Sequence, residues 1–230
     1  MKYIIMMVLG VVLSLGVSFA GDKLELKDQD QKESYTLGYK SGENFLKQGI
    51  DIDADAFSAG FRDAIGGAAS QMTEEEMSAV LADIQKRFVA AQQDRFREMS
   101  AKNLEEGKTF LAQNAKKDGV KTLPSGLQYK VIQKGSGKMP KADDTVTVNY
   151  RGMFMNGTEF DSSYKRGQPA TFKVNGVIKG WTEALQLMKE GAKWELFIPS
   201  DLAYGERSVG QTIPPNSTLI FEVELLSIQP

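Results

Sequence analysis

The chain has 230 residues, of which 41% are hydrophobic and 25% are charged, and its formal net charge is −2. This length is enough for one or two domains with buried cores, and the slightly acidic balance argues against nucleic acid as a partner. The chain contains no histidine and no cysteine. Imidazole and thiolate chemistry, disulfide bonds and an anchor on an N-terminal cysteine are therefore excluded, sites for soft metals are disfavoured, and we expect neither a cofactor nor a metal ion.

The first twenty residues differ from the rest in composition. Lys2 precedes an uncharged apolar run that reaches Phe19 and is followed by Ala20. This pattern is typical of a secretory signal, and we predict that residues 1–20 are a signal peptide cleaved before Gly21. The alternative is a membrane anchor, because the run approaches the ~20 residues of a spanning helix, although small residues interrupt it.

Residues 24–119 contain no proline, and their apolar side chains recur at spacings of three and four, which predicts helices. The first stripe consists of Tyr35, Tyr39, Gly42 and Leu46, and the second of Phe57, Phe61 and Ile65. Gly49 separates the two stripes, and Gly66 and Gly67 end the second. We expect residues 21–72 to form an N-terminal helical domain.

A long helix is predicted next. Thr73 and Glu76 have the spacing of a capping box. If Gly107 is tolerated, the helix covers residues 73–118 and is roughly 65 Å long at 1.5 Å per residue. Its first half is amphipathic, and two short helices cannot bury that apolar stripe alone. We therefore predict dimerisation through the N-terminal helices; a compact monomeric three-helix bundle with a solvated extension is the alternative.

The sequence pattern changes at residues 119–126, which contain a Pro-Ser-Gly turn and which we interpret as a linker. Beyond it, apolar residues alternate as in a half-buried antiparallel sheet, at Leu127, Tyr129 and Val131, at Val146, Val148 and Tyr150, and at Leu219, Phe221, Val223 and Leu225. Asn156 and Gly157 predict a hairpin, and residues 181–188 are the one convincing helix of this half. The predicted fold class is α+β, with an antiparallel sheet wrapped on one short helix at 127–230, preceded by an all-α region with one long helix.

Five segments of the C-terminal half share their order and spacing with one known family. They are VNYRG at 148–152, GTEFDSS at 157–163, VIKGW at 177–181, IPSDLAYG at 198–205 and IPPNSTLIFEVEL at 213–225. In these segments the chain resembles the FKBP-type peptidyl-prolyl cis-trans isomerases. The resemblance implies an FKBP-like domain that isomerises Xaa-Pro peptide bonds in an apolar, aromatic-walled pocket.

The resemblance also implies the residues of that pocket. The catalytic residues would be Asp161, Tyr204, Phe172, Trp181 and Phe221, and the substrate-binding residues would be Tyr150, Phe160, Arg166, Val177, Ile178 and Ile213. In the family pattern, Trp181 is the indole floor, and Arg166 is the ionic neighbour of Asp161. The Tyr204 hydroxyl would point into the cleft, and the Ile178 amide would bind the ligand backbone.

Taken alone, these residues have simpler interpretations. The aromatic rings fit ordinary core packing, Asp161 fits a turn, and Arg166 fits a solvated loop. Two departures from the family pattern also bear on substrate preference and inhibitor fit: Ala170 stands where many members have a bulky aromatic residue beside Phe172, and the link from Phe172 to Val177 is short. The loop at 206–212, expected to overhang the pocket, carries Val209 where some members have histidine.

The chemistry of the reaction suits a chain without histidine or cysteine. Rotation about an Xaa-Pro bond meets a barrier close to the ~18–20 kcal/mol of amide resonance, but no bond to another atom is made or broken. The planar amide separates charge, whereas the twisted transition state is less polar. A dry aromatic pocket therefore disfavours the planar state more than the twisted one.

The order of parts along the whole chain, together with YTLGY at 35–39 and DADAF at 53–57, looks like the macrophage infectivity potentiator-type subgroup. That resemblance implies an exported homodimer in the periplasm or at the outer membrane of a Gram-negative bacterium. Its partners would be Xaa-Pro peptides, unfolded exported proteins and tacrolimus-type macrolide inhibitors. The alternative function is a holdase chaperone or a proline-recognising binding protein in which isomerisation is secondary.

Overall fold

The computed structural model describes residues 24–229, so the predicted signal peptide at 1–20 lies outside the described residues. Contacts divide the chain into two compact units, Met1–Gln71 and Met72–Pro230. Within residues 24–229, no helix combines the length and the apolar character that a membrane crossing requires.

The first unit contains helices α1 (Gln29–Gln48) and α2 (Ala54–Gly66). Each helix begins at an aspartate whose side chain accepts an N–H from the first turn, and each ends at a left-handed glycine, Gly49 or Gly67. The predicted breaks are thus confirmed. Phe45 and Phe57 join the two helices through an edge-to-face contact with ring centres 5.7 Å apart. Neither helix contains a buried residue, so both have apolar surface to cover.

Helix α3 (Glu74–Asn114) opens the second unit and contains 41 residues, which corresponds to about 61 Å. The predicted capping box is confirmed, since Thr73 and Glu76 each bond the other's backbone N–H. The predicted end at Asp118 is wrong by four residues. Beyond Asn114 the hydrogen bonds become those of tight turns, because Lys116 and Lys117 donate their N–H groups to carbonyls three residues back. The buried Asn114 amide donates to the Gln128 side chain.

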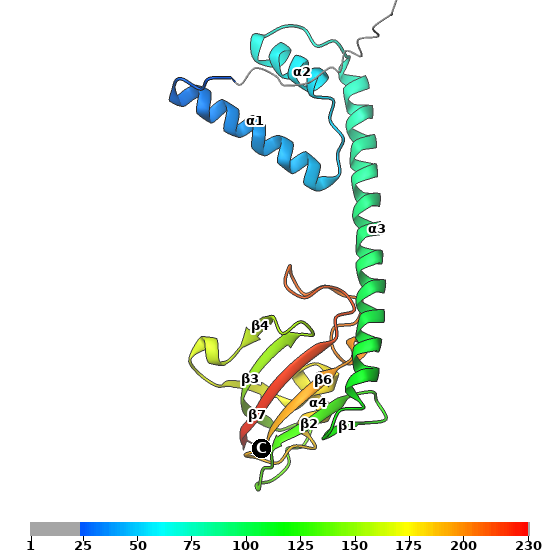
Figure 1. Ribbon diagram of the computed structural model, residues 1–230, viewed down its shortest axis with the longest axis vertical. Helices are drawn as coiled ribbons and strands as arrows, with labels where there is room; N and C mark the ends of the chain where they lie inside the picture. The colour runs from blue at the N-terminus through cyan, green and yellow to red at the C-terminus, as the bar shows by residue number, and fades with distance from the viewer. Residues whose placement is uncertain (1–23, 230) are drawn as a thin grey trace, which may run out of the picture. The chain divides into compact units, whose positions relative to one another are not determined.

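The second unit is built on a seven-stranded sheet in which all the described pairings are antiparallel. The strands are β1 (Val120–Thr122), β2 (Gln128–Gln133), β3 (Thr145–Phe154), β4 (Glu159–Ser162), β5 (Ala170–Lys173), β6 (Lys193–Ile198) and β7 (Leu219–Gln229). Their order is β1-β2-β6-β7-β3-β4, and β5 also pairs with β3 (Figure 1). The segment predicted as a linker therefore contains β1, which pairs with β2. Strand β6 was not predicted.

One short helix, α4 (Lys179–Leu185), packs on this sheet, as the α+β prediction required. It begins two residues before the predicted range 181–188 and ends three residues earlier, and Met188 in the following turn is fully buried. The core consists of α4 side chains against alternate residues of the strands, including Val146, Val148, Leu196 and Val223. The predicted hairpin is also confirmed, because Phe154 donates its N–H to the Thr158 carbonyl and Gly157 is left-handed.

The C-terminal part of α3 is fastened to the sheet domain, while its N-terminal part extends beyond the strands (Figure 1). The Asn103 amide donates to the Pro215 carbonyl at 2.8 Å, and the Asn216 amide donates to Ser100 at 2.8 Å. Phe110 lies 6.1 Å from Phe197, measured between ring centres. These contacts join the long helix to the loop that precedes β7 and to β6.

Gly107 allows the close approach of α3 to this loop, so a larger side chain at this position is expected to destabilise the protein. A Cβ atom at position 107 would lie 2.3 Å from Thr218 Oγ1. Alanine favours a free helix by up to ~1 kcal/mol over glycine, yet we expect Gly107→Ala to lower the free energy of unfolding by about 1–3 kcal/mol through overpacking. Urea unfolding measures this change. The double variant with Thr218→Ala should recover part of the loss, whereas a Gly107→Ala protein more stable than the parent would contradict this packing.

Candidate active site

A cavity of about 410 Å³ lies over the start of α4, between strands β3, β4, β5 and β7. Its lining is mainly aromatic and aliphatic, and consists of Tyr150, Phe160, Asp161, Phe172, Gly176, Val177, Ile178, Trp181, Tyr204 and Phe221. No cluster of acidic residues suited to hold a metal ion occurs between residues 24 and 229. The cavity can therefore bind an apolar group but carries little polar chemistry.

The floor of the cavity is the indole of Trp181, which is 4% exposed. Three rings meet it edge-on, with centres 5.3 Å away for Tyr150, 5.8 Å for Phe172 and 5.3 Å for Phe221. Such T-shaped pairs add about 0.5–1.5 kcal/mol each beyond the burial of their area. The floor is thus rigid and preformed.

The wall beside this floor depends on a glycine in β3. A Cβ atom at Gly152 would lie 2.7 Å from the Phe160 ring and 2.8 Å from the Phe221 ring. Because glycine has no Cβ, the two rings close over the strand and meet edge-on with centres 5.6 Å apart. The local sequence of β3 therefore shapes the cavity.

A hydrogen-bonded network forms the polar edge. The Tyr150 hydroxyl donates to Asp161 Oδ2 at 2.5 Å, and Arg166 donates from Nη1 to Asp161 Oδ1 at 2.5 Å. Arg166 also donates from Nη2 to the Tyr150 hydroxyl at 2.7 Å, and the Ser162 N–H donates to Asp161 Oδ1 at 2.8 Å. Both carboxylate oxygens are therefore held in fixed positions at the rim of the cavity.

Three N–H or O–H donors around the cavity have no hydrogen-bond partner among the described residues. They are the Trp181 Nε1–H, which is buried, the Ile178 backbone N–H and the Tyr204 hydroxyl. Of the three, only the Trp181 donor is buried, and an unsatisfied buried donor costs free energy, so a ligand carbonyl oxygen would gain most there. The Ile178 and Tyr204 donors are available to further carbonyl oxygens of a ligand. The site is thus suited to bind peptide backbone around an apolar ring.

The protonation states at the site follow from burial and from this network. Burial raises the pKa of Tyr150, and its hydrogen bond to Asp161 raises it further. Burial opposes ionisation of Asp161, but the hydrogen bonds from Tyr150 and Arg166 outweigh it and lower the pKa of the carboxyl. Burial, together with the charge of Asp161, raises the pKa of Tyr204. At neutral pH the site therefore contains one carboxylate and two neutral phenols.

We expect kcat/KM to be flat between about pH 5 and about pH 9. The lowered pKa of Asp161 keeps the carboxyl ionised even below its ordinary titration range, so its contribution to stability is lost only when the pH falls through that lowered value. The raised pKa values of Tyr150 and Tyr204 keep both phenols neutral in this range. The cis-trans exchange of an Xaa-Pro tetrapeptide, measured across this pH range, checks the prediction. A kcat/KM that changes with a midpoint near pH 7 would contradict it.

Most residues predicted for the site line the cavity together. They are Tyr150, Phe160, Asp161, Phe172, Val177, Ile178, Trp181, Tyr204 and Phe221. Arg166 does not line it but bonds to Asp161 and Tyr150, consistent with the predicted ionic neighbour. Gly176 lines the cavity and was not predicted, because a residue without a side chain gave no signal in the sequence.

Two further predicted features do not appear in the cavity lining. Ile213 is 6% exposed and belongs to the hydrophobic core, and its contact with substrate stays a prediction. The loop at 206–212 was expected to overhang the pocket, but none of its residues lines the cavity. A bridge between Val209 and Ile213 folds the loop on itself, and Thr212 lines a different hollow.

Comparisons with known proteins agree with this geometry. Residues 136–226 match the family model described as FKBP-type peptidyl-prolyl cis-trans isomerase, and residues 30–131 match the domain amino terminal to it. The chain is 48% identical to the peptidyl-prolyl cis-trans isomerase Mip of Coxiella burnetii, over 100% of this chain and 99% of that protein. It is 46% identical to the outer membrane protein MIP of Legionella longbeachae, over 100% of this chain and 98% of that protein.

A solved structure supports the same assignment for the fold. The crystal structure of FkpA from Escherichia coli aligns with a TM-score of 0.76 and 42% sequence identity, covering 90% of this chain and 99% of that one. The aromatic cavity lies within the matched isomerase region. The chain therefore belongs to the FKBP-type peptidyl-prolyl cis-trans isomerases.

Proposed function

We propose that the aromatic cavity binds the prolyl ring of an Xaa-Pro bond and that this enzyme thereby assists the folding of exported proteins. The observation that carries the proposal is the preformed floor, in which three rings meet the Trp181 indole edge-on. A pyrrolidine ring is apolar and compact, so it fits such a floor. Its flanking carbonyls supply acceptors for the unpaired donors at the rim.

In the proposed mechanism the site acts on the charge distribution of the amide without covalent chemistry. Planar Xaa-Pro carries negative charge on its carbonyl oxygen, and that charge falls as the bond twists. The fixed carboxylate of Asp161 repels the oxygen in the planar state, and the aromatic floor withholds solvent from it. Both effects weaken in the twisted state, so the barrier falls.

Positioning is the second part of the proposed mechanism. The Ile178 N–H and the Tyr204 hydroxyl hold the backbone on either side of the prolyl ring, so rotation is confined to one bond. Val177 lies at the rim against the ring. A barrier lowered by about 7 kcal/mol would speed isomerisation by roughly five orders of magnitude.

Two assays separate this function from the alternative of a holdase. Refolding of a protein limited by a prolyl isomerisation tests catalysis, and suppression of the aggregation of a client without slow prolines tests holding. We expect catalysis at substoichiometric amounts of enzyme, with tacrolimus as a competitor for the cavity. Aggregation suppressed only at stoichiometric amounts, with unchanged refolding rates, would favour the holdase.

Dimerisation through the N-terminal helices is part of the proposal. A hollow of about 450 Å³ lies between α1 and α2, with Gly38 and Gly42 on one side and Phe57 on the other. Leu46 also lines it, although its own side chain is 76% exposed. Small residues beside exposed apolar ones suit the close approach of a second copy of these helices.

Sedimentation of residues 21–230 tests the dimer. We expect a dimer for the parent sequence and a shift toward monomer for Leu46→Glu, while turnover of a short Xaa-Pro peptide stays unchanged. Lys40→Glu on the same helix serves as a control for the added charge. A parent chain that sediments as a monomer at micromolar concentration would contradict this part of the proposal.

We propose that the protein is exported to the periplasm or the outer membrane. The support is the charged residue and apolar run at the N-terminus, together with the Legionella relative that is named an outer membrane protein. Fractionation of cells expressing the full chain tests this. A protein of undiminished length in the cytoplasmic fraction would contradict it.

A further inference from the structure

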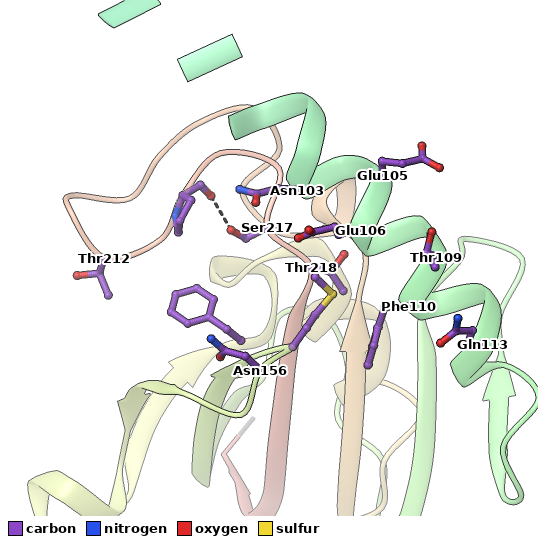
Figure 2. A pocket seen from close by; sticks show the side chains of 13 residues that line it. Asn103, Glu105, Glu106, Thr109, Phe110, Gln113, Asn156, Thr212, Ser217 and Thr218 are labelled. Carbon is purple, nitrogen blue, oxygen red and sulfur yellow. Dashed lines mark hydrogen bonds between the residues drawn. The ribbon is translucent and has the colours of Figure 1, made fainter. Parts of the chain in front are cut away.

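A second hollow, of about 700 Å³, lies outside the aromatic cavity. We call it the helix groove. It is bounded by the C-terminal part of α3, the tip of the β3–β4 hairpin and the loop before β7 (Figure 2). Its apolar lining residues are Phe110, Phe154, Met155 and Pro214. Glu105 and Glu106 are the only charged side chains among its lining residues, so the lining has acidic character.

The groove is a preformed feature. The Asn103 amide donates to the Pro215 carbonyl, and the Ser217 hydroxyl donates to the Pro214 carbonyl at 2.8 Å, which is the dashed contact in Figure 2. The close contact at Gly107 presses α3 against the same loop. The helix side and the loop side of the groove are thus fixed to each other before any ligand binds.

Glu106 is the acidic residue that faces the interior of the groove. Asn103, Glu106 and Phe110 follow one another at spacings of three and four, and Figure 2 shows their side chains on the side of α3 toward Ser217 and Thr218. Glu105 projects from the other side of the helix, at the rim. A cationic group inside the groove would therefore meet the Glu106 carboxylate.

Two lysines lie near residues of this lining, Lys102 beside Glu106 and Lys117 over the Phe110 ring. Lys102 Nζ is 3.9 Å from Glu106 Oε1, but both side chains are more than half exposed, at 71% and 54%. Exposed pairs of this kind contribute little, so a bound cation can take the place of Lys102. Lys117 Nζ lies 5.6 Å from the centre of the Phe110 ring, which shows that this ring is accessible to a cation.

The groove and the aromatic cavity share a wall. Phe154 lines the groove, Phe160 lines the cavity, and their ring centres are 4.9 Å apart. An extended chain advances about 3.3 Å per residue, so a polypeptide held at its proline needs only about three to six further residues to pass a wall of one ring pair. One client chain can therefore reach both hollows.

We propose that the helix groove is a second subsite for the polypeptide substrate, and that it binds an apolar side chain adjacent to a lysine or arginine a few residues from the prolyl residue. The apolar side chain packs on Phe110, Phe154 and Met155, and the cation pairs with Glu106. This inference rests on the proposed binding of Xaa-Pro in the cavity. It makes the enzyme selective for sequence beyond the residues next to proline.

Peptide kinetics with the full mature chain test the subsite. The substrates are one Xaa-Pro tetrapeptide and a set of 14-residue peptides with the same centre, carrying Leu-Lys or Leu-Glu three to six residues before or after the proline. At one spacing we expect kcat/KM for the Leu-Lys peptide to exceed that for Leu-Glu by roughly fivefold, through a lower KM. Glu106→Gln should remove this difference and leave the tetrapeptide unchanged.

Glu98→Gln is the matched control, because Glu98 is exposed on α3 and does not line the groove. Binding is also measured without catalysis, by titrating a Leu-Lys peptide with alanine in place of proline and following the Met155 methyl signal by NMR. Normal tetrapeptide turnover with equal kcat/KM for all long peptides and an unmoved Met155 signal would overturn the subsite alone. Loss of tetrapeptide turnover with a shifted Met155 signal would instead overturn the function proposed for the cavity.

Discussion

Replacing Asp161 with asparagine is expected to lower kcat/KM for an Xaa-Pro tetrapeptide by at least about tenfold, which corresponds to about 1.4 kcal/mol of transition-state stabilisation. The side chain keeps its shape but loses the charge that repels the amide oxygen in the planar state. Arg166 and the Tyr150 hydroxyl also lose their anionic acceptor. Most of the loss should appear in kcat, because the prolyl ring still finds the same aromatic floor.

Asp201→Asn is the control for this variant. Asp201 is an exposed aspartate in the short 3-10 turn before Tyr204, and it does not line the cavity. The Asp201→Asn substitution therefore removes one carboxylate without changing the hydrogen-bonded network of Tyr150, Asp161 and Arg166. Exchange measurements at saturating and limiting peptide separate kcat from KM. An Asp161→Asn enzyme with undiminished turnover would refute the role assigned to the carboxylate.

Phe221→Ala is expected to lower the free energy of unfolding by about 3–5 kcal/mol, the range for deleting a buried phenylalanine side chain. Phe221 is 5% exposed and contacts Trp181 and Phe160 edge-on, so its loss leaves a hole in both floor and wall. Activity should fall as well, because the Trp181 indole is no longer held. Urea unfolding measures the stability change.

Phe221→Leu separates the two effects of this deletion. A change that conserves much of the volume costs under about 1.5 kcal/mol, so the domain stays folded while the aromatic wall is lost. We expect kcat/KM for the leucine variant to fall severalfold although its unfolding midpoint is near that of the parent. Phe96→Ala, at a 42% exposed ring on α3, should change neither quantity. Equal stability of Phe221→Ala and the parent would contradict the packing described for the floor.

Local sequence patterns predicted the elements of the fold well. Alternation identified β3 and β7 because one face of each strand is buried in the core, and β2 because Tyr129 and Val131 pack against that core. The glycines at 49 and 67 ended α1 and α2 as expected. The missed elements are too short or too irregular for a periodic pattern to report. β1 is only three residues long and exists through its pairing with β2, and α3 ends in tight turns that no proline or glycine marks at Asn114.

The cavity was predicted more completely than the fold boundaries, but by the ordered family segments rather than by periodicity. Alternation alone describes Tyr150 and Phe221 as core residues, which they also are. Ile213 lies in a family segment but does not line the cavity, so its predicted contact with substrate stays a prediction. The positions of Gly176 and of the helix groove arise from contacts between segments far apart in the chain, and no local pattern reports them.

Catalysis of Xaa-Pro rotation by the aromatic cavity is the property on which the proposed function depends most directly. NMR exchange spectroscopy on an Xaa-Pro tetrapeptide, with the mature chain at about one-hundredth of the peptide concentration, measures this rotation. We predict that the cis-trans exchange time falls from tens of seconds to well under a second. Asp161→Asn should lose most of this acceleration, and Asp201→Asn should retain it. Exchange that stays at the uncatalysed rate with the parent chain would contradict the account.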